Sequence, residues 1–127
     1  MKYSVAVVLV LTLLVVSSSK LSAQDQSSSA GVVNLFKSYI NDGNIVGMLS
    51  LYGDVDINTP LQPSNYERMR GPMSTLQGAW SGQPFILLSD SSTVIHVSSP
   101  LTHEYIKFYT AQYDAKWYIK DTEVYDK

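Results

Sequence analysis

The sequence predicts an α+β domain in which three helices precede an antiparallel sheet. Two observations carry this prediction. Residues 30–52 and 72–80 repeat their apolar side chains at the spacing of an α-helix, whereas residues 85–125 form short alternating runs separated by polar turns. With 127 residues, of which 45% are hydrophobic, the chain is long enough for one domain with a packed core.

The first 23 residues are typical of a signal peptide. Lys2 gives a positive start, and residues 5–16 form an apolar run of 12 residues interrupted only by Thr12. At about 1.5 Å per residue this run is too short to span about 30 Å of hydrocarbon. We therefore expect cleavage near Ala23 and a secreted or periplasmic protein with no membrane segment after cleavage. An uncleaved membrane anchor is the alternative.

A polar linker and two helices are expected next. Residues 24–29 read QDQSSS, contain no apolar side chain and are expected to be mobile, so the folded domain should span residues 30–127. A preceding serine can cap the first helix, whose apolar side chains recur at steps of three and one. These side chains are Val32, Leu35, Phe36, Tyr39 and Ile40. Asp42 and Gly43 end this helix, and Asn44 caps the second.

The second helix is short, and a strand, a loop and a third helix are expected after it. Its apolar side chains are Ile45, Met48, Leu49 and Tyr52. Residues 55–58 predict a strand, and residues 59–66, which contain two prolines, predict a loop. Pro72 is expected at the first position of the third helix, which stops at residues 81–84. The apolar stripe of that helix is Met73, Leu76, Ala79 and Trp80.

Four antiparallel strands complete the expected fold. They cover residues 85–88, 93–98, 102–113 and 116–125, and a polar turn at residues 89–92 joins the first two. In the third strand, alternation predicts two faces. One face carries Glu104, Ile106, Phe108 and Thr110, and the other carries His103, Tyr105, Lys107 and Tyr109. Asp114 and Ala115 are expected to form the last turn.

Composition excludes several classes of function. The chain has no cysteine, which removes disulfides, thiol catalysis and metal sites that need cysteine. Residues 24–127 carry seven basic and eleven acidic side chains, a formal charge of −4, without the clustered Lys and Arg that bind nucleic acid. His96 and His103 are seven residues apart, which matches no metal-binding motif. We expect no metal, no cofactor and no nucleic-acid partner.

Three stretches follow one another in an order that suggests a family. They are VVNLFKSYINDGNIVGMLSLYGDV, RGPMSTL and FYTAQYDAKWYIKDTEVY, and together they cover most of residues 31–126. In this order the chain resembles the nuclear transport factor 2-like superfamily, also called SnoaL-like or ketosteroid-isomerase-like. The resemblance implies a cone-shaped, cystatin-like fold with three N-terminal helices against a curved sheet and a pocket at its mouth. The family's last turn carries a glycine where this sequence has Ala115.

The resemblance also implies where catalytic residues would stand. In steroid isomerases of this superfamily, a tyrosine on the first helix donates to an oxyanion, and a carboxylate before a proline removes a proton. The corresponding positions hold Phe36 and Thr59, and the neighbouring Asn58 is not acidic either. Neither side chain can perform the family chemistry, so isomerase activity of that type is not expected.

Candidate site residues remain on several elements. The side chains expected to line a ligand pocket are Phe36, Tyr52, Thr59, Trp80, His96 and Tyr105. Tyr52 and Trp80 could line a cavity or simply fill the core. His96 is the best candidate for a general base because imidazole titrates near neutral pH, and Asp56 is the second. Arg68 and Arg70 could meet a carboxylate ligand or form a solvated turn.

We therefore expect an exported domain that binds a small apolar or amphipathic ligand, or a protein partner, without catalysis of the family type. The resemblance implies a homodimer formed through the exposed face of the sheet. Two alternatives stay open. An isomerase or lyase-like enzyme would place His96 or Asp56 in a closed cavity beside Tyr52, and a structural dimerisation module would have a filled cone and a broad apolar sheet face.

Overall fold

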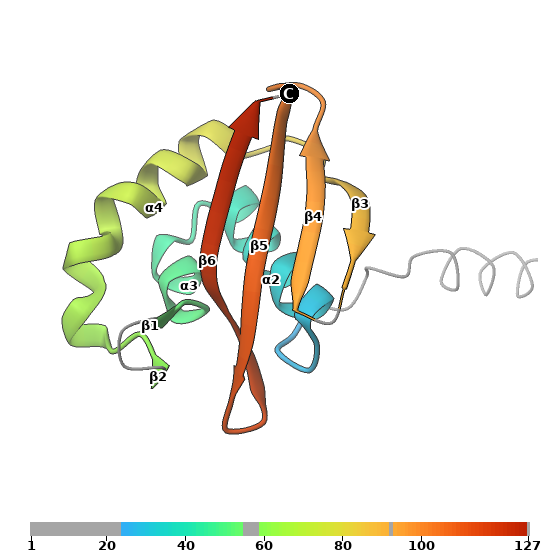
Figure 1. The fold of residues 1–127 in the computed structure, drawn as a ribbon. Helices are drawn as coiled ribbons and strands as arrows, with labels where there is room; N and C mark the ends of the chain where they lie inside the picture. Colours follow the sequence, from blue (N-terminus) through green and yellow to red (C-terminus); the bar gives the residue numbers. More distant parts are fainter. Residues whose placement is uncertain (1–23, 55–58, 92, 127) are drawn as a thin grey trace, which may run out of the picture.

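The computed structural model describes residues 24–54, 59–91 and 93–126 and has an α+β architecture (Figure 1). Its main sheet is curved and has the strand order β3-β4-β5-β6, with every neighbouring pair antiparallel. Helix α2 lies across one face of this sheet and contacts β4, β5 and β6, while α3 and α4 pack against α2 and against each other. The predicted α+β class, with three helices and a curved four-stranded antiparallel sheet, is confirmed. The predicted signal peptide and the strand at 55–58 lie outside the described residues.

The first two helices begin and end where the sequence marks them. Helix α2 spans Ser29–Asp42, and the side chain of Ser28 caps it by accepting a hydrogen bond from a backbone N–H of the first turn. Gly43 ends α2 with a φ of 71°, in the left-handed region that glycine tolerates best. The side chain of Asn44 caps α3, which spans Ile45–Ser50. These caps confirm the predicted helix boundaries, except that α3 ends before Tyr52.

The segment that was expected to be a mobile linker is hydrogen-bonded to the sheet. The carbonyl of Gln26 accepts from the backbone N–H of Trp117 at 2.9 Å, and the Gln26 side-chain amide donates to the Trp117 carbonyl at 3.0 Å. Ser29, expected in the linker, is the first residue of α2, and its buried hydroxyl forms a 2.7 Å hydrogen bond with Thr110. The low apolar content of this segment did not indicate these contacts, because the segment makes them through polar groups.

Helix α4 begins six residues earlier than predicted. It spans Tyr66–Trp80, follows the 3₁₀ turn η1 (Pro63–Asn65), and contains Pro72 in its interior on the exposed side. The side chains of α4 that pack on the core recur at steps of three and four residues. They are Tyr66, Met69, Met73, Leu76 and Trp80. Because Tyr66 and Met69 contact the core, the part of the helix that precedes Pro72 is held in place.

Two short strands connect α3 to α4 and attach to the edge of the main sheet. Strand β1 (Gly53–Asp54) pairs antiparallel with β2 (Thr59–Pro60), so part of the predicted loop is a strand. Tyr52 forms a parallel bridge with Ile119, whose N–H donates to the Leu51 carbonyl at 2.7 Å. The edge strand β6 is therefore hydrogen-bonded at Ile119 to the segment that leads into β1.

The four strands of the main sheet agree with the predicted ranges to within two residues. They are β3 (Ile86–Asp90), β4 (Val94–Ser99), β5 (Glu104–Tyr113) and β6 (Lys116–Asp126). The predicted alternation in β5 is also confirmed, because Ile106, Phe108 and Thr110 are buried and the residues between them are not. In β4, Ile95, Val97 and Ser99 are buried in the same way.

The turn between β5 and β6 carries a strained alanine. Tyr113 pairs with Lys116, and the two residues between them, Asp114 and Ala115, have φ values of 48° and 66°. Two-residue hairpins favour such positive φ angles, which glycine tolerates and alanine does not. We expect Ala115→Gly to raise the free energy of unfolding by about 0.5–1 kcal/mol, as measured by urea denaturation.

The matched control is Ala111→Gly in β5, where the backbone does not have a positive φ. Glycine there relieves no strain and adds entropy to the unfolded chain, so stability should fall. A less stable Ala115→Gly variant would contradict the assignment of strain to this turn.

Candidate functional site

The structure divides the predicted pocket residues between two faces of the sheet. Phe36, Tyr52 and Trp80 are 0%, 7% and 1% exposed and belong to the core between the helices and the sheet. His96 and Tyr105 alternate with buried residues in β4 and β5 and therefore lie on the opposite, outer face. These five side chains do not line one pocket. Thr59 lies in β2, but its side chain is outside the description.

The inner group packs together in the core between the helices and the sheet. The Phe36 ring lies 5.8 Å from the Tyr52 ring and 5.9 Å from the Phe108 ring, and Trp80 lies 6.2 Å from Phe108. The Tyr52 hydroxyl forms a 2.6 Å hydrogen bond with Thr122, and burial raises the pKa of Tyr52 to about 12. Phe36, Tyr52 and Trp80 are therefore packed in the core, and Tyr52 keeps its phenolic proton at neutral pH.

The outer group forms an aromatic cluster on the surface of the sheet. The hydroxyl of Tyr125 and Nε2 of His96 form a 2.6 Å hydrogen bond, and the Tyr125 ring stacks on Tyr105 with centroids 5.6 Å apart. The ammonium of Lys107 lies 5.7 Å above the Tyr125 ring. His96 therefore does not reach into a closed cavity beside Tyr52. The other proposed base, Asp56, lies outside the described residues.

Other candidate chemistry finds little support in the described ranges. Within residues 24–54, 59–91 and 93–126, no three His, Cys, Asp or Glu side chains come together in a way that could hold a metal ion. In the same part of the chain, no helix has the length and apolar character needed to cross a membrane. Arg70 forms an ion pair with Glu67 at 3.1 Å on the exposed side of α4.

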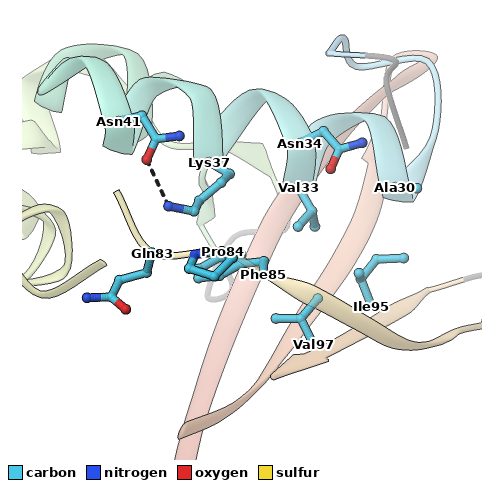
Figure 2. A pocket seen from close by; sticks show the side chains of 10 residues that line it. All are labelled: Ala30, Val33, Asn34, Lys37, Asn41, Gln83, Pro84, Phe85, Ile95 and Val97. Carbon is cyan, nitrogen blue, oxygen red and sulfur yellow. Dashed lines mark hydrogen bonds between the residues drawn. The ribbon is translucent and has the colours of Figure 1, made fainter. Parts of the chain in front are cut away.

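A groove of about 230 Å³ lies between α2 and the chain that leads into β3 (Figure 2). One wall is a single face of α2, whose side chains recur at steps of three, one, three and four. They are Ala30, Val33, Asn34, Lys37 and Asn41. The opposite wall consists of Gln83, Pro84, Phe85, Ile95 and Val97. From position 30 to position 41 the helix wall is about 16 Å long.

Polar contacts fix one end of this groove, where the end of α4 meets α2. The Lys37 ammonium donates to the Asn41 side-chain oxygen at 2.8 Å and to the Trp80 carbonyl at 2.7 Å. The same Asn41 oxygen accepts from the backbone N–H of Gly82 at 3.0 Å. These bonds hold the turn that carries Gln83 against the helix, so the groove is formed before any ligand binds.

Three polar groups in the groove are incompletely satisfied. Nδ2 of Asn34 and Oε1 of Gln83 are buried and have no hydrogen-bond partner among the described residues. Figure 2 shows Asn34 toward the Ala30 end of the groove and Gln83 beneath Asn41 at the other end. Between them, the Lys37 ammonium lies 4.8 Å from the Phe85 ring centroid, and burial lowers the pKa of Lys37. The groove thus combines apolar walls with a free donor, a free acceptor and a cation.

A second hollow of about 270 Å³ lies at the hairpin between β4 and β5. It brings Ser99, His103 and Glu104 together, a combination that could suggest nucleophilic catalysis. However, the buried hydroxyl of Ser99 has no hydrogen-bond partner within the described ranges, and Glu104 accepts from the Trp80 indole N–H at 3.1 Å. Since no base contacts the serine, this hollow lacks the arrangement of a catalytic triad.

A scan against protein-family models, a search of curated proteins and a search of solved structures each return no match for this chain.

The groove was not predicted from the sequence. The apolar side chains of α2 were the ones that the spacing singled out, and Asn34, Lys37 and Asn41 were not among them. The available indication was the regular spacing of these three positions, each on the same side of the helix. The groove exists only because residues 83–85 lie across this side of α2. Their position depends on the turn at the end of α4, where the Gly82 N–H donates to Asn41.

Proposed function

We propose that this domain binds a small amphipathic molecule in the groove between α2 and residues 83–85, and that it does not act on this molecule chemically. One observation carries the proposal. Asn34 and Gln83 each bury a polar atom without a partner, and both residues line the same largely apolar groove. A buried unpaired donor or acceptor costs about 1–3 kcal/mol, and a ligand that pairs with it recovers that free energy.

The walls of the groove support binding of a ligand with an apolar body. Phe85, Ile95 and Val97 on one side face Val33 on the other. Sites for small molecules are usually concave and mainly apolar, with a few polar groups that fix the orientation of the ligand. A ligand here would offer an acceptor to Asn34 and a donor to Gln83.

The absence of an activated base favours binding over catalysis. The described groove residues include no histidine and no carboxylate, and the positions of the family's donor and base hold Phe36 and Thr59. The isomerase or lyase-like alternative would have to rely on Asp56, because His96 is engaged with Tyr125 on the outer face. The structural-module alternative agrees with the filled core but leaves the unpaired groove atoms unexplained.

Export and homodimerisation remain part of the proposal as predictions. Cleavage after Ala23 would leave Gln24 as the first residue, two positions before the Gln26 contacts with β6. A second copy would meet the outer face of the sheet, where Tyr105 and Tyr125 stack. Native mass spectrometry of the exported protein measures the cleavage site and the number of chains together.

Asn34→Leu tests the proposed site with two opposite expectations. The variant removes the buried unpaired amide, so the ligand-free protein should be as stable as the wild type or more stable, by up to about 1 kcal/mol. Its affinity for 4-phenylbutanamide, a neutral probe with an apolar body and an amide head, should fall about tenfold because the donor is lost. Thermal denaturation and isothermal titration calorimetry measure the two effects.

The control is Tyr125→Phe, which removes the hydrogen bond to His96 on the outer face without touching the groove. It should bind the probe as the wild type does. No binding of the probe to the wild-type protein, or equal loss of binding in both variants, would contradict the proposed site.

A further inference from the structure

Strand β3 is an edge of the main sheet, and one side of its backbone is open. In the strand order β3-β4-β5-β6, β4 is its one neighbouring strand among the described residues (Figure 1). In an antiparallel pair, alternate residues turn their N–H and C=O groups away from the neighbouring strand. An edge strand therefore presents a row of unpaired donors and acceptors, which another extended chain can match.

The side chains at the start of β3 do not protect this edge. Natural edge strands are often guarded by charged side chains or proline, which discourage pairing with another chain. All five residues of β3 are exposed, and the first three are apolar: Ile86, Leu87 and Leu88 are 48%, 38% and 46% exposed. Asp90, at the far end, is the only charged residue of the strand. The beginning of β3 is therefore an open, apolar edge.

This edge continues the apolar wall of the groove. Residues 83–85 line the groove and lead directly into β3. Leu87 pairs with Val97, whose residue lines the groove, and paired residues point to the same face of a sheet. Leu87 thus extends the apolar wall from the groove toward the open edge. A ligand that follows this wall out of the groove reaches the unpaired backbone of β3.

The end of the groove at the start of β3 carries a positive charge. The Lys37 ammonium donates there to the Asn41 side chain and the Trp80 carbonyl, and it lies 4.8 Å from the Phe85 ring centroid. None of the residues that line the groove is acidic. A negative charge that approaches this end is attracted to Lys37 and meets no carboxylate in the groove.

This charge favours one direction for a chain that pairs with β3. Every pair of neighbouring strands in the main sheet is antiparallel, and antiparallel pairing is slightly more stable per residue than parallel pairing. The C-terminal end of an antiparallel chain lies beside the start of β3, which follows Phe85 and is therefore near Lys37. The negative charge of a peptide's C-terminus matches the cation at that end.

We propose that the natural partner of this surface is an extended peptide with apolar side chains, which pairs antiparallel with the open edge of β3 and ends in the groove near Lys37. In this mode of binding the peptide adds a strand to the sheet. Main-chain hydrogen bonds supply the affinity, and side-chain contacts supply the selectivity. The inference rests on the proposed function, because it names the class of molecule whose end occupies the groove.

Two N-methylated peptides test the backbone pairing. The probe is the pentapeptide Thr-Val-Thr-Phe-Thr with free termini. One analogue is N-methylated at its second and fourth residues, and the other at its third and fifth. Since only alternate residues direct their N–H toward a neighbouring strand, one analogue should bind within about threefold of the parent and the other at least about tenfold more weakly, as measured by isothermal titration calorimetry.

Blocking the two ends of the peptide separately tests its direction. Amidation of the C-terminus removes the charge near Lys37 and should weaken binding about threefold to fivefold, whereas acetylation of the N-terminus should have a smaller effect. The difference between the acid and the amide should persist in Lys37→Arg and disappear in Lys37→Met. A larger effect of acetylation, or a difference that survives in Lys37→Met, would contradict the proposed direction.

Hydrogen exchange on the wild-type protein reports on β3 itself. Binding of the pentapeptide should slow the exchange of alternate backbone amides between Ile86 and Asp90 at least about tenfold. Native mass spectrometry of the free protein adds the number of chains. A dimer in which these amides are already protected without peptide would show that a second copy occupies the edge, and this result would overturn the inference.

4-Phenylbutanamide separates the inference from the proposed function, because it has an apolar body and a polar head but cannot add a strand. If it binds in the groove while the pentapeptide does not bind, or while both N-methylated analogues bind alike, the peptide inference is overturned and the groove remains a site for small molecules. Failure of both 4-phenylbutanamide and the pentapeptide to bind overturns the proposed function as well.

Discussion

Phe36→Ala should lower the free energy of unfolding by about 3–5 kcal/mol, the range for removing a fully buried aromatic side chain. Phe36 has no exposed surface, and its ring contacts Tyr52 at 5.8 Å and Phe108 at 5.9 Å between centroids. It therefore joins α2 to the sheet at the centre of the core. Since small domains have about 5–15 kcal/mol of stability, the variant should be only marginally folded.

The same measurement distinguishes a filled core from a hollow one. If Phe36 lined a ligand cavity, as the family resemblance implies for this position, its ring would already face solvent or an occupant and its loss would cost much less. The control is Leu35→Ala, which removes a partly buried side chain from the adjacent position of α2. A loss for Phe36→Ala of about 1 kcal/mol or less, similar to the control, would contradict a packed core.

At alkaline pH the wild-type protein should lose about 2–3 kcal/mol of stability through Tyr52 alone, between pH 10 and pH 12. Burial raises the pKa of Tyr52 to about 12, whereas an unfolded tyrosine titrates near pH 10. In this window the folded protein keeps the phenolic proton and the unfolded chain loses it. Folding therefore becomes less favourable as pH rises, and the full contribution of Tyr52 is present only below pH 10.

Comparing Tyr52→Phe with the wild type isolates this effect from the other titrating groups. At neutral pH the variant should be about 1 kcal/mol less stable, because it loses the hydrogen bond to Thr122. The two stability curves should cross between pH 10 and pH 12. Thr122→Val is the matched control, because it loses the same hydrogen bond but keeps the buried phenol and should keep the alkaline loss. Parallel curves for Tyr52→Phe and the wild type would show that Tyr52 does not titrate as described.

The sequence was most informative where the backbone itself needs particular residues. Ser28 and Asn44 cap helices as the pattern suggested, and Gly43 takes the left-handed conformation at the end of α2. In β5, alternation correctly divided the side chains between two faces, because side chains in a strand must point to opposite sides. These features depend on local chemistry that a short window of sequence contains.

Predictions failed where long-range contacts override local preference. Pro72 favours a helix start, yet α4 begins at Tyr66 because Tyr66 and Met69 reach the core. Gln26 belongs to a polar segment but binds the backbone of Trp117 across the fold. Neither partner is near in sequence, so no local pattern could indicate these contacts.

The candidate site was even harder to predict from the sequence, because it too depends on contacts between residues that are far apart in the chain. The candidate pocket residues Phe36, Tyr52 and Trp80 are the residues that the core uses for packing. The groove instead uses Asn34 and Lys37 on another side of α2, and these become distinctive only because residues near Phe85 cover them. A buried polar atom without a partner is a property of tertiary structure and cannot be identified in a sequence alone.

The central claim is that the ligand site is the groove along α2. Its most direct test is a ¹H–¹⁵N NMR titration of the wild-type protein with 4-phenylbutanamide, following backbone amides and the side-chain amides of Asn34 and Gln83. The account predicts that the largest shifts belong to Asn34 and to residues 83–85, with little change at Tyr105 and Tyr125. Shifts concentrated on the outer face of the sheet, or around Tyr52 and Phe108 in the core, would contradict it.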